Sequence, residues 1–389
     1  MGKFAVRTYD AISPVGLRRY SSDYTVGPEI EQPDAIMLRS FSLHGEPVPD
    51  SVLAIGRAGA GVNNIPVEQM TSRGIVVFNA PGANANSVKE LVVAGLLLAV
   101  RNLPAALAYA KALPEQDMKK AVERGKKQFA GAELSGSTLG VIGLGAIGYR
   151  VANVAADLGM RVLGYDPAIS SQHAADLSAQ VQRVDSLDRL LAESDFVTLH
   201  VPLADTTVGL LDAARIAQLR PGVVLLNFAR DELVDERALI AAMDAGDVRG
   251  YVTDFPNPTV YAHEKVIVLP HLGASTSSAE DNCAIMIADQ LQDYLENGNI
   301  RHSVNFPAVS LPRRGYLRLT LAHRNTPGVI AEFAKLISGA GINVVELIND
   351  CKGNHAYSIM EVDVAELPRD VLDRLGAMPQ LLRLRIIAG

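Results

Sequence analysis

The sequence predicts an α/β protein with two parallel-sheet domains, followed by a small α+β domain at the C-terminus. Between Leu139 and Leu269, six apolar strand candidates alternate with helical stretches, which is typical of a parallel sheet buried on both faces. Before residue 85, short apolar runs alternate with turn-rich stretches in a similar way. From about Gly315 the elements follow the order β-α-β-β-α-β, which is the ferredoxin-like order.

The elements can be justified in chain order. Residues 52–61 and 74–82 each predict a buried strand that ends in a glycine-rich loop. Ser87 then starts a long apolar helix, because serine is a good N-cap and Glu90, three residues later, completes a capping box. The six strands of the middle part are TLGVIGLG, MRVLGYD, FVTLHVP, VVLLNFA, GYVTDF and VIVLPH. The strands of the last part are YLRLTLAH, NVVELIND, AYSIMEVDV and LLRLRIIA.

Composition limits the class of protein. A chain of 389 residues is too long for one typical core. A net charge of −7, with acids and bases interspersed, argues against nucleic-acid and anionic-membrane partners. The longest apolar run, Leu91 to Val100, is about half of a bilayer span, and the N-terminus lacks the apolar region of a signal peptide. Cys283 and Cys351 form no disulfide or metal pattern. We therefore expect a cytoplasmic protein without a metal.

A glycine motif predicts a dinucleotide site in the middle domain. Gly143, Gly145 and Gly148 lie between a strand candidate and a helix candidate. In a Rossmann-like domain such glycines form the tight turn, admit the pyrophosphate and let the helix pack on the strand. The next strand ends at Tyr165 and Asp166, about twenty residues further on, where the fingerprint places a ribose-binding acid. An acid there repels a 2′-phosphate, which favours NAD over NADP. The alternative is a tight turn without a ligand.

Polar side chains follow four strands of the same domain: His200, Arg230, Asp254 and His271. Ligands of open α/β sheets bind outside the carboxyl ends of the strands. Interconversion of a 2-hydroxy acid and a 2-keto acid needs a cation for the carboxylate and a group that moves the hydroxyl proton. Arginine suits the first task and histidine the second. Arg230 and His271 are therefore the predicted catalytic pair, although either residue alone could be structural.

The motifs together resemble the D-3-phosphoglycerate dehydrogenase family, within the D-2-hydroxyacid dehydrogenases. They are RSF at 39–41, GRAGAGVNNI at 56–65, FNAPGANANSVKELVVAGLLL at 78–98, VIGLGAIG at 141–148, HVPL at 200–203, NFAR at 227–230, TDFPN at 253–257 and PHLGAST at 270–276. The resemblance implies a discontinuous substrate-binding domain (1–85 and 280–305), an NAD-binding domain (86–279), a linker (306–314) and a regulatory ACT domain (315–389).

The resemblance also implies an activity, which is NAD-dependent oxidation of D-3-phosphoglycerate to 3-phosphohydroxypyruvate, the first step of serine biosynthesis. Arg230 would hold the substrate carboxylate, His271 would act as general acid and base, and Asp254 would complete the catalytic group. The cofactor would contact Gly143, Gly145, Ala146, Ile147, Gly148, Tyr165, Asp166, His200, Val201, Pro202, Asn227, Phe228, Ala229, Asp254 and Gly273. The substrate would contact Arg39, Ser40, Arg57, Ala58, Gly59, Ala60, Gly61 and Arg230, with the arginines at 39 and 57 facing its phosphate.

One departure from the family pattern concerns the catalytic histidine. The family places a glutamate a few residues after the strand-end aspartate, where it hydrogen-bonds the histidine. Here the segment Asp254 to Thr259 contains no glutamate. Glu264 precedes its strand, so it would lie roughly 20 Å from His271 at the opposite sheet edge. We hypothesise that His271 either lacks its usual partner or uses Asp254 instead.

The C-terminal module resembles an ACT domain, which binds amino acids between paired copies. His323, Asn325 and Asn343 match the residues that hold serine across a subunit interface in serine-regulated relatives. The resemblance therefore implies L-serine as an effector, a dimer formed through the cofactor domains and a tetramer formed through the ACT modules. The alternative is a dimerisation module without a ligand.

Two other functions remain open from the sequence. The chain could act on another 2-hydroxy acid of the glyoxylate, hydroxypyruvate or lactate type. It could also be a catalytically weakened NAD-sensing regulatory protein, and the missing glutamate is the feature that favours this reading. Fold alone does not decide between them.

Overall fold

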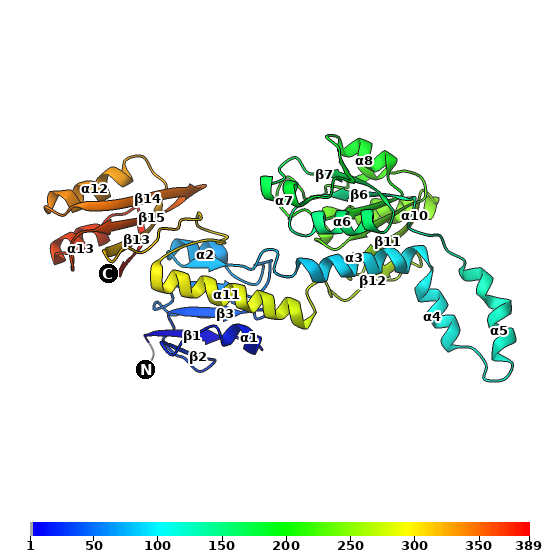
Figure 1. The fold of residues 1–389 in the computed structure, drawn as a ribbon, viewed down its shortest axis with the longest axis horizontal. Coiled ribbons are helices and arrows are strands. Elements are labelled where there is room, and N and C mark those ends of the chain that lie inside the picture. The colour runs from blue at the N-terminus through cyan, green and yellow to red at the C-terminus, as the bar shows by residue number, and fades with distance from the viewer. Residues whose placement is uncertain (1–2) are drawn as a thin grey trace. The chain divides into compact units, whose positions relative to one another are not determined.

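A computed structural model describes residues 3–389 (Figure 1). The chain divides into two compact units. One unit combines the chain up to Asn84 with Glu280–Gly389, and the other is Ala85–Ala279. The first unit therefore contains both the N-terminal α/β sheet and the C-terminal α+β module.

The N-terminal sheet is parallel and has the strand order β2-β1-β3-β4-β5. Its elements are β1 (Phe4–Thr8), α1 (Pro14–Leu17), β2 (Tyr24–Gly27), β3 (Ala35–Leu38), β4 (Ala54–Arg57), α2 (Val67–Ser72) and β5 (Val76–Phe78). The long helix α11 (Ser277–Asn297) returns to this sheet and buries Ile287 and Leu291 against it. A Cβ at Gly56 would overlap Ile287, so this glycine allows helix and strand to approach closely.

The second unit is built on a seven-stranded parallel sheet with the order β12-β11-β10-β9-β6-β7-β8. Its strands are β6 (Thr138–Ile142), β7 (Arg161–Tyr165), β8 (Val181–Arg183), β9 (Phe196–Leu199), β10 (Val223–Asn227), β11 (Val248–Thr253) and β12 (Val266–Val268). Its helices include α6 (Gly148–Asp157), α7 (Ser171–Asp176), α8 (Leu187–Glu193), α9 (Ala213–Ile216) and α10 (Glu236–Ala245), with short 3-10 turns η1 (Lys126–Phe129) and η2 (Asp231–Leu233). The strand β8 was not predicted, because two of its three residues are exposed and it lies at the sheet edge.

The helix before this sheet, α3 (Ala85–Val100), begins two residues earlier than predicted. Ser87 lies inside the helix and is buried, so the prediction that it is the N-cap was wrong. Asn86 and Glu90 instead form a side-chain hydrogen bond of 2.7 Å, one helical turn apart.

Two helices that the sequence analysis did not predict follow α3: α4 (Leu103–Lys111) and α5 (Met118–Gly125). Each is preceded by a residue in the left-handed conformation, Asn102 or Asp117. Among residues 3–389, no single helix is long and apolar enough to span a bilayer; α3 and α4 reach that length only as a pair, and they are bent by 70°.

The C-terminal module has the predicted order β13 (Leu317–Arg324), α12 (Val329–Gly339), β14 (Val344–Lys352), β15 (His355–Val362), α13 (Arg369–Gly376) and β16 (Leu381–Ile387). Its antiparallel sheet has the order β14-β15-β13-β16. Both helices cover one face, where Leu319 and Leu321 pack against Phe333. The prediction of two parallel-sheet domains with a ferredoxin-like C-terminal domain is confirmed.

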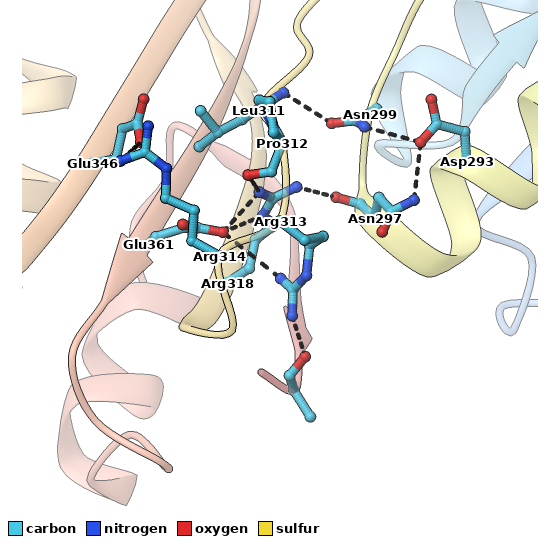
Figure 2. Close-up of polar contacts among 11 residues, drawn as sticks. Asp293, Asn297, Asn299, Leu311, Pro312, Arg313, Arg314, Arg318, Glu346 and Glu361 are labelled. Atoms are coloured by element: carbon cyan, nitrogen blue, oxygen red, sulfur yellow. Dashed lines mark hydrogen bonds and ion pairs between the residues drawn. The ribbon is translucent and has the colours of Figure 1, made fainter.

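The opposite face of this sheet contacts the end of α11. Arg318 and Glu361 are fully buried and form an ion pair of 2.7 Å. The same guanidinium donates to the carbonyl oxygens of Asn297, the last residue of α11, and of Pro312 in the linker, as Figure 2 shows. Arg385 donates to the Tyr294 and Leu295 carbonyl oxygens. The C-terminal module therefore supplies hydrogen-bond donors to the carbonyl groups in the last turn of α11.

We predict that Glu361→Ala destabilises the protein strongly, because it leaves the Arg318 guanidinium buried without its counter-charge. The expected loss is about 3–5 kcal/mol in the free energy of unfolding, measured by chemical denaturation. The matched control is Arg314→Ala, which removes an ion pair to Glu346 whose arginine is 58% exposed; its expected cost is about 0–1 kcal/mol. Equal losses in the two variants would contradict this prediction.

Candidate functional site

The predicted catalytic and cofactor residues follow consecutive strands of the seven-stranded sheet. Since all its strands are parallel, their carboxyl ends meet at one edge. Along this edge, in the strand order of the sheet, the residues that follow each strand are His271 (β12), Asp254 (β11), Arg230 (β10), His200 (β9), Gly143 (β6) and Asp166 (β7). The sheet therefore brings together residues that lie far apart in the chain.

The three motif glycines have different structural roles. Gly143 has a positive φ of 89°, which favours glycine. A Cβ at Gly148 would overlap the Gly143 carbonyl oxygen, so this position needs glycine for the turn to close. A Cβ at Gly145 would meet nothing within 4 Å. Gly145 is therefore not required for packing, and the space beside it can admit a ligand.

The helix that follows the glycine turn can receive an anion. α6 starts at Gly148, and its N-cap residue, Ile147, supplies no side-chain hydrogen bond to the first turn. The first amide groups of a helix need acceptors, and a phosphate can provide them. Together with the open space beside Gly145, this end of α6 fits the pyrophosphate of a dinucleotide.

Asp166 lies directly beside the glycine turn. Its carboxylate accepts hydrogen bonds from the backbone N–H groups of Leu144 and Ala168, both at 2.8 Å. Tyr165, the last residue of β7, is half-buried next to it. The predicted ribose-binding acid is thus fixed to the same turn that would hold the pyrophosphate.

His200 packs against the glycine turn. Its backbone carbonyl oxygen lies where a Cβ of Gly143 would be, and its ring accepts or donates a hydrogen bond of 3.0 Å with Thr198. Burial lowers the pKa of His200 to about 3, so the ring is neutral near pH 7. The neighbouring Val201 and Pro202 continue the same loop.

Arg230 is held by the turn that follows β10. The fully buried Asn227 donates to the Arg230 carbonyl oxygen at 2.7 Å and accepts from the Ala229 N–H at 3.1 Å. Phe228, between them, packs against Gly95 of α3. The backbone of Arg230 is therefore fixed, while its side chain is half-buried.

Asp254 holds the backbone of the loop that contains His271. Its buried carboxylate accepts from the N–H groups of Leu272 and Gly273, each at 2.7 Å. Burial raises the pKa of Asp254, and the hydrogen bonds from these two amides oppose that rise. His271 itself has a φ of 56°, which is uncommon for a residue other than glycine.

The imidazole of His271 contacts an aromatic ring. It meets Phe255 edge to face, with ring centroids 5.1 Å apart. In the part of the chain that the structure describes, this imidazole makes no hydrogen bond or ion pair. Asp254, which we considered as its partner, uses both carboxylate oxygens for backbone amides. Glu264 precedes β12 and lies at the other end of that strand from His271.

The predicted phosphate-facing residues lie at two neighbouring strand ends of the N-terminal sheet. Arg39 and Ser40 follow β3, and Arg57 ends β4. Arg57 donates to the Arg39 carbonyl oxygen at 3.1 Å. The Arg57 side chain occupies the space where a Cβ of Gly59 would be, so it lies over the loop of Ala58, Gly59, Ala60 and Gly61. The structure brings this predicted group together.

Two further residues of this region were not predicted. Asp10 accepts hydrogen bonds from the Ser40 and Phe41 N–H groups at 2.8 and 2.6 Å. Glu280, in the first turn of α11, forms an ion pair of 2.6 Å with Arg39. Neither residue belongs to a motif, and both act on partners that are distant in the sequence. No local pattern could have revealed them.

The three predicted effector residues do not meet in one copy of the chain. His323 is buried, and its ring nitrogens contact the Arg324 carbonyl oxygen, Asn349 and Ser358. Asn325 lies just after β13, next to the β14–β15 turn, whereas Asn343 lies just before β14, at the other end of the sheet. The length of these strands separates the two asparagines by roughly 30 Å.

Known proteins support the family that the motifs indicate. Residues 95–273 match the NAD-binding domain of D-isomer specific 2-hydroxyacid dehydrogenases. Among solved structures, the chain is similar to an NAD⁺-bound 3-phosphoglycerate dehydrogenase of Entamoeba histolytica (25% identity, TM-score 0.60, 78% of this chain and 98% of that one). It also shares the fold of a D-2-hydroxyisocaproate dehydrogenase (22% identity, TM-score 0.64, 77% of this chain and 99% of that one).

Curated relatives are D-3-phosphoglycerate dehydrogenases. The protein of Synechocystis is 35% identical over 82% of this chain, and that of Methanocaldococcus jannaschii is 36% identical over 82%. The chain spans only 57% and 60% of the length of these two relatives. It covers 82% of the Escherichia coli K12 protein, at 33% identity over 87% of this chain. The chain therefore belongs to the D-3-phosphoglycerate dehydrogenase family, and it contains the NAD-binding domain of the D-isomer specific 2-hydroxyacid dehydrogenases.

Proposed function

We propose that this protein oxidises D-3-phosphoglycerate to 3-phosphohydroxypyruvate with NAD⁺. The observation that carries the proposal is the order of Arg230, Asp254 and His271 on three adjacent strand ends of the NAD-binding domain. The names of the relatives agree with this reaction.

The proposed chemistry divides the work among three residues. The glycine turn and Asp166 would hold NAD⁺, which would supply the acceptor for the hydride from C2 of the hydroxy acid. Arg230 pairs with the substrate carboxylate, since a guanidinium matches a carboxylate in a bidentate geometry. His271 removes the proton from the C2 hydroxyl group as general base and returns it in the reverse reaction. Asp254 acts through the backbone, because its hydrogen bonds fix the residues that follow His271.

The residues at the strand ends of the N-terminal sheet indicate the substrate class. We assign recognition of the phosphate to Arg39 and Arg57, with Ser40 beside them. Two guanidinium groups at neighbouring strand ends can pair with several phosphate oxygens, whereas an unphosphorylated acid would leave them without that ligand.

We predict that the chain oxidises NADH in the presence of 3-phosphohydroxypyruvate and that His271→Asn lowers kcat by about 10²- to 10⁴-fold, since the proton donor is lost. The control is His263→Asn, at the other end of β12, where the imidazole contacts Asp244; its kcat should stay within about twofold. A chain that binds NADH but reduces neither 3-phosphohydroxypyruvate nor hydroxypyruvate would instead support a regulatory, NAD-sensing function.

The cofactor site can be tested separately from turnover. Gly145→Val should weaken NADH binding by about tenfold or more, because its side chain would fill the space proposed for the pyrophosphate. The melting temperature should not fall, since nothing lies within 4 Å of a Cβ there. Gly376→Val, at a second glycine with open surroundings, is the control and should leave NADH binding unchanged. Unaltered binding in Gly145→Val, measured by fluorescence titration, would reject this site.

We further propose that L-serine is an effector and that it binds between two copies of the C-terminal module. The exposed Asn325 and Asn343 would contact it, one from each copy, because a single copy holds them roughly 30 Å apart. His323 would fix the end of β13 through Asn349 and Ser358.

A dimer through the NAD-binding domains is supported by four exposed apolar side chains on α4 and α5: Leu103, Leu107, Met118 and Val122.

Serine should inhibit the reaction, and Asn325→Ala or Asn343→Ala should raise the serine concentration for half-inhibition by about tenfold, because each removes hydrogen bonds to the effector. Ser338→Ala, on the exposed side of α12, serves as control. A wild-type chain that shows neither inhibition nor heat of serine binding would leave the module with a dimerisation role only.

A further inference from the structure

We propose that Glu280 determines how strongly the enzyme prefers phosphorylated to unphosphorylated hydroxy acids, by competing with the substrate phosphate for Arg39. This inference rests on the proposed function, in which Arg39 receives the phosphate. It adds a residue that no motif of the chain includes.

The ion pair is well placed for such competition. The Arg39 Nη1 and Glu280 Oε1 atoms are 2.6 Å apart, and the two side chains are 26% and 40% exposed. Glu280 is an acidic residue in the first turn of α11. The Glu280 carboxylate is thus paired with the guanidinium that would bind the phosphate. Solvent can reach this ion pair.

A second arginine and a thiol show that this carboxylate belongs to one charged group. Arg57 contacts the Arg39 backbone. Cys283 lies one helical turn after Glu280; burial raises the pKa of its thiol, the charges of Arg57 and Arg39 lower it, and the charge of Glu280 raises it further. The charges of Arg39, Arg57 and Glu280 therefore all act on the Cys283 thiol.

The backbone of Arg39 does not depend on Glu280. Its carbonyl oxygen accepts from Arg57 Nε and Asn64 Nδ2, both at 3.1 Å. The next two amide groups donate to Asp10. Loss of the Glu280 carboxylate should therefore free the guanidinium without displacing the loop that carries it.

The competition is unequal, and this makes it a determinant of specificity. A partly exposed ion pair is weak, whereas a phosphate with nearly two charges and three acceptor oxygens binds a guanidinium more strongly than one carboxylate does. A phosphorylated substrate must break the Arg39–Glu280 pair before it binds. An unphosphorylated acid leaves the pair intact. Glu280 therefore weakens the binding of the phosphorylated acid but not that of the unphosphorylated acid. It thereby narrows the enzyme's preference for the phosphorylated substrate.

The test is Glu280→Gln, which keeps the shape of the side chain and removes its charge. NADH oxidation is measured with 3-phosphohydroxypyruvate and with hydroxypyruvate. We expect kcat/KM for the phosphorylated acid to rise about three- to fivefold, with the value for hydroxypyruvate unchanged. Asp289→Asn is the matched control, since Asp289 lies on the same helix and forms a 2.7 Å pair with Arg19; it should change neither value.

A double variant tests whether the effect passes through Arg39. In the Arg39→Gln background, Glu280→Gln should no longer raise kcat/KM for the phosphorylated acid. A persistent rise would overturn the proposal, as would an equal change for both substrates or a loss for the phosphorylated one in the single variant.

Binding of inorganic phosphate separates this inference from the proposed function. Calorimetry of the full chain should show tighter phosphate binding in Glu280→Gln than in the wild type, and no change in Asp289→Asn. This holds even if the chain turns over neither acid. Equal or weaker phosphate binding in Glu280→Gln would refute the competition, whatever the activity assays show.

Discussion

The constraint on which the candidate site depends is the parallel order of the seven-stranded sheet. In a parallel sheet every strand ends at the same edge, so side chains that are distant in the sequence become neighbours there. β12, β11 and β10 place His271, Asp254 and Arg230 side by side, while β6 and β7 place the glycine turn and Asp166 further along the same edge. The residues proposed for catalysis and those proposed for cofactor binding therefore lie at one edge of the sheet.

Hydrogen bonds between polar side chains and backbone groups then fix three loops at this edge; Asp254 and Asn227 are buried, and Asp166 is half-buried. Asp254 accepts from the two amides that follow His271, and Asn227 donates to the Arg230 carbonyl oxygen. Asp166 accepts from the Leu144 amide in the glycine turn. Buried polar groups need such partners, since an unpaired one is costly. A left-handed residue such as His271 persists only where its surroundings enforce it. These residues therefore position the site even where they do not contact a ligand.

The sequence predicted the features that local patterns encode. Apolar runs and glycine turns revealed both sheets, the C-terminal module and the residues after each strand, because these signals lie within a few neighbouring residues. The helix start at Ser87 was predicted wrongly, since the Ser-x-x-Glu pattern of a capping box here lies inside a helix, where Ser87 is buried and Glu90 accepts from Asn86. The ion pair between Arg39 and Glu280 was missed, because nothing near either residue indicates the other.

The helix α11 joins the two regions to which we assign recognition of small molecules. Its first turn holds Glu280 against Arg39, and its last carbonyl groups accept from Arg318 and Arg385 of the C-terminal sheet. A helix transmits a displacement along its length because its own hydrogen bonds keep it rigid. The same helix therefore contacts both of these regions. Arg318, which donates to the last residue of α11, is itself held by the fully buried Glu361, so loss of that carboxylate would leave an uncompensated charge at this junction.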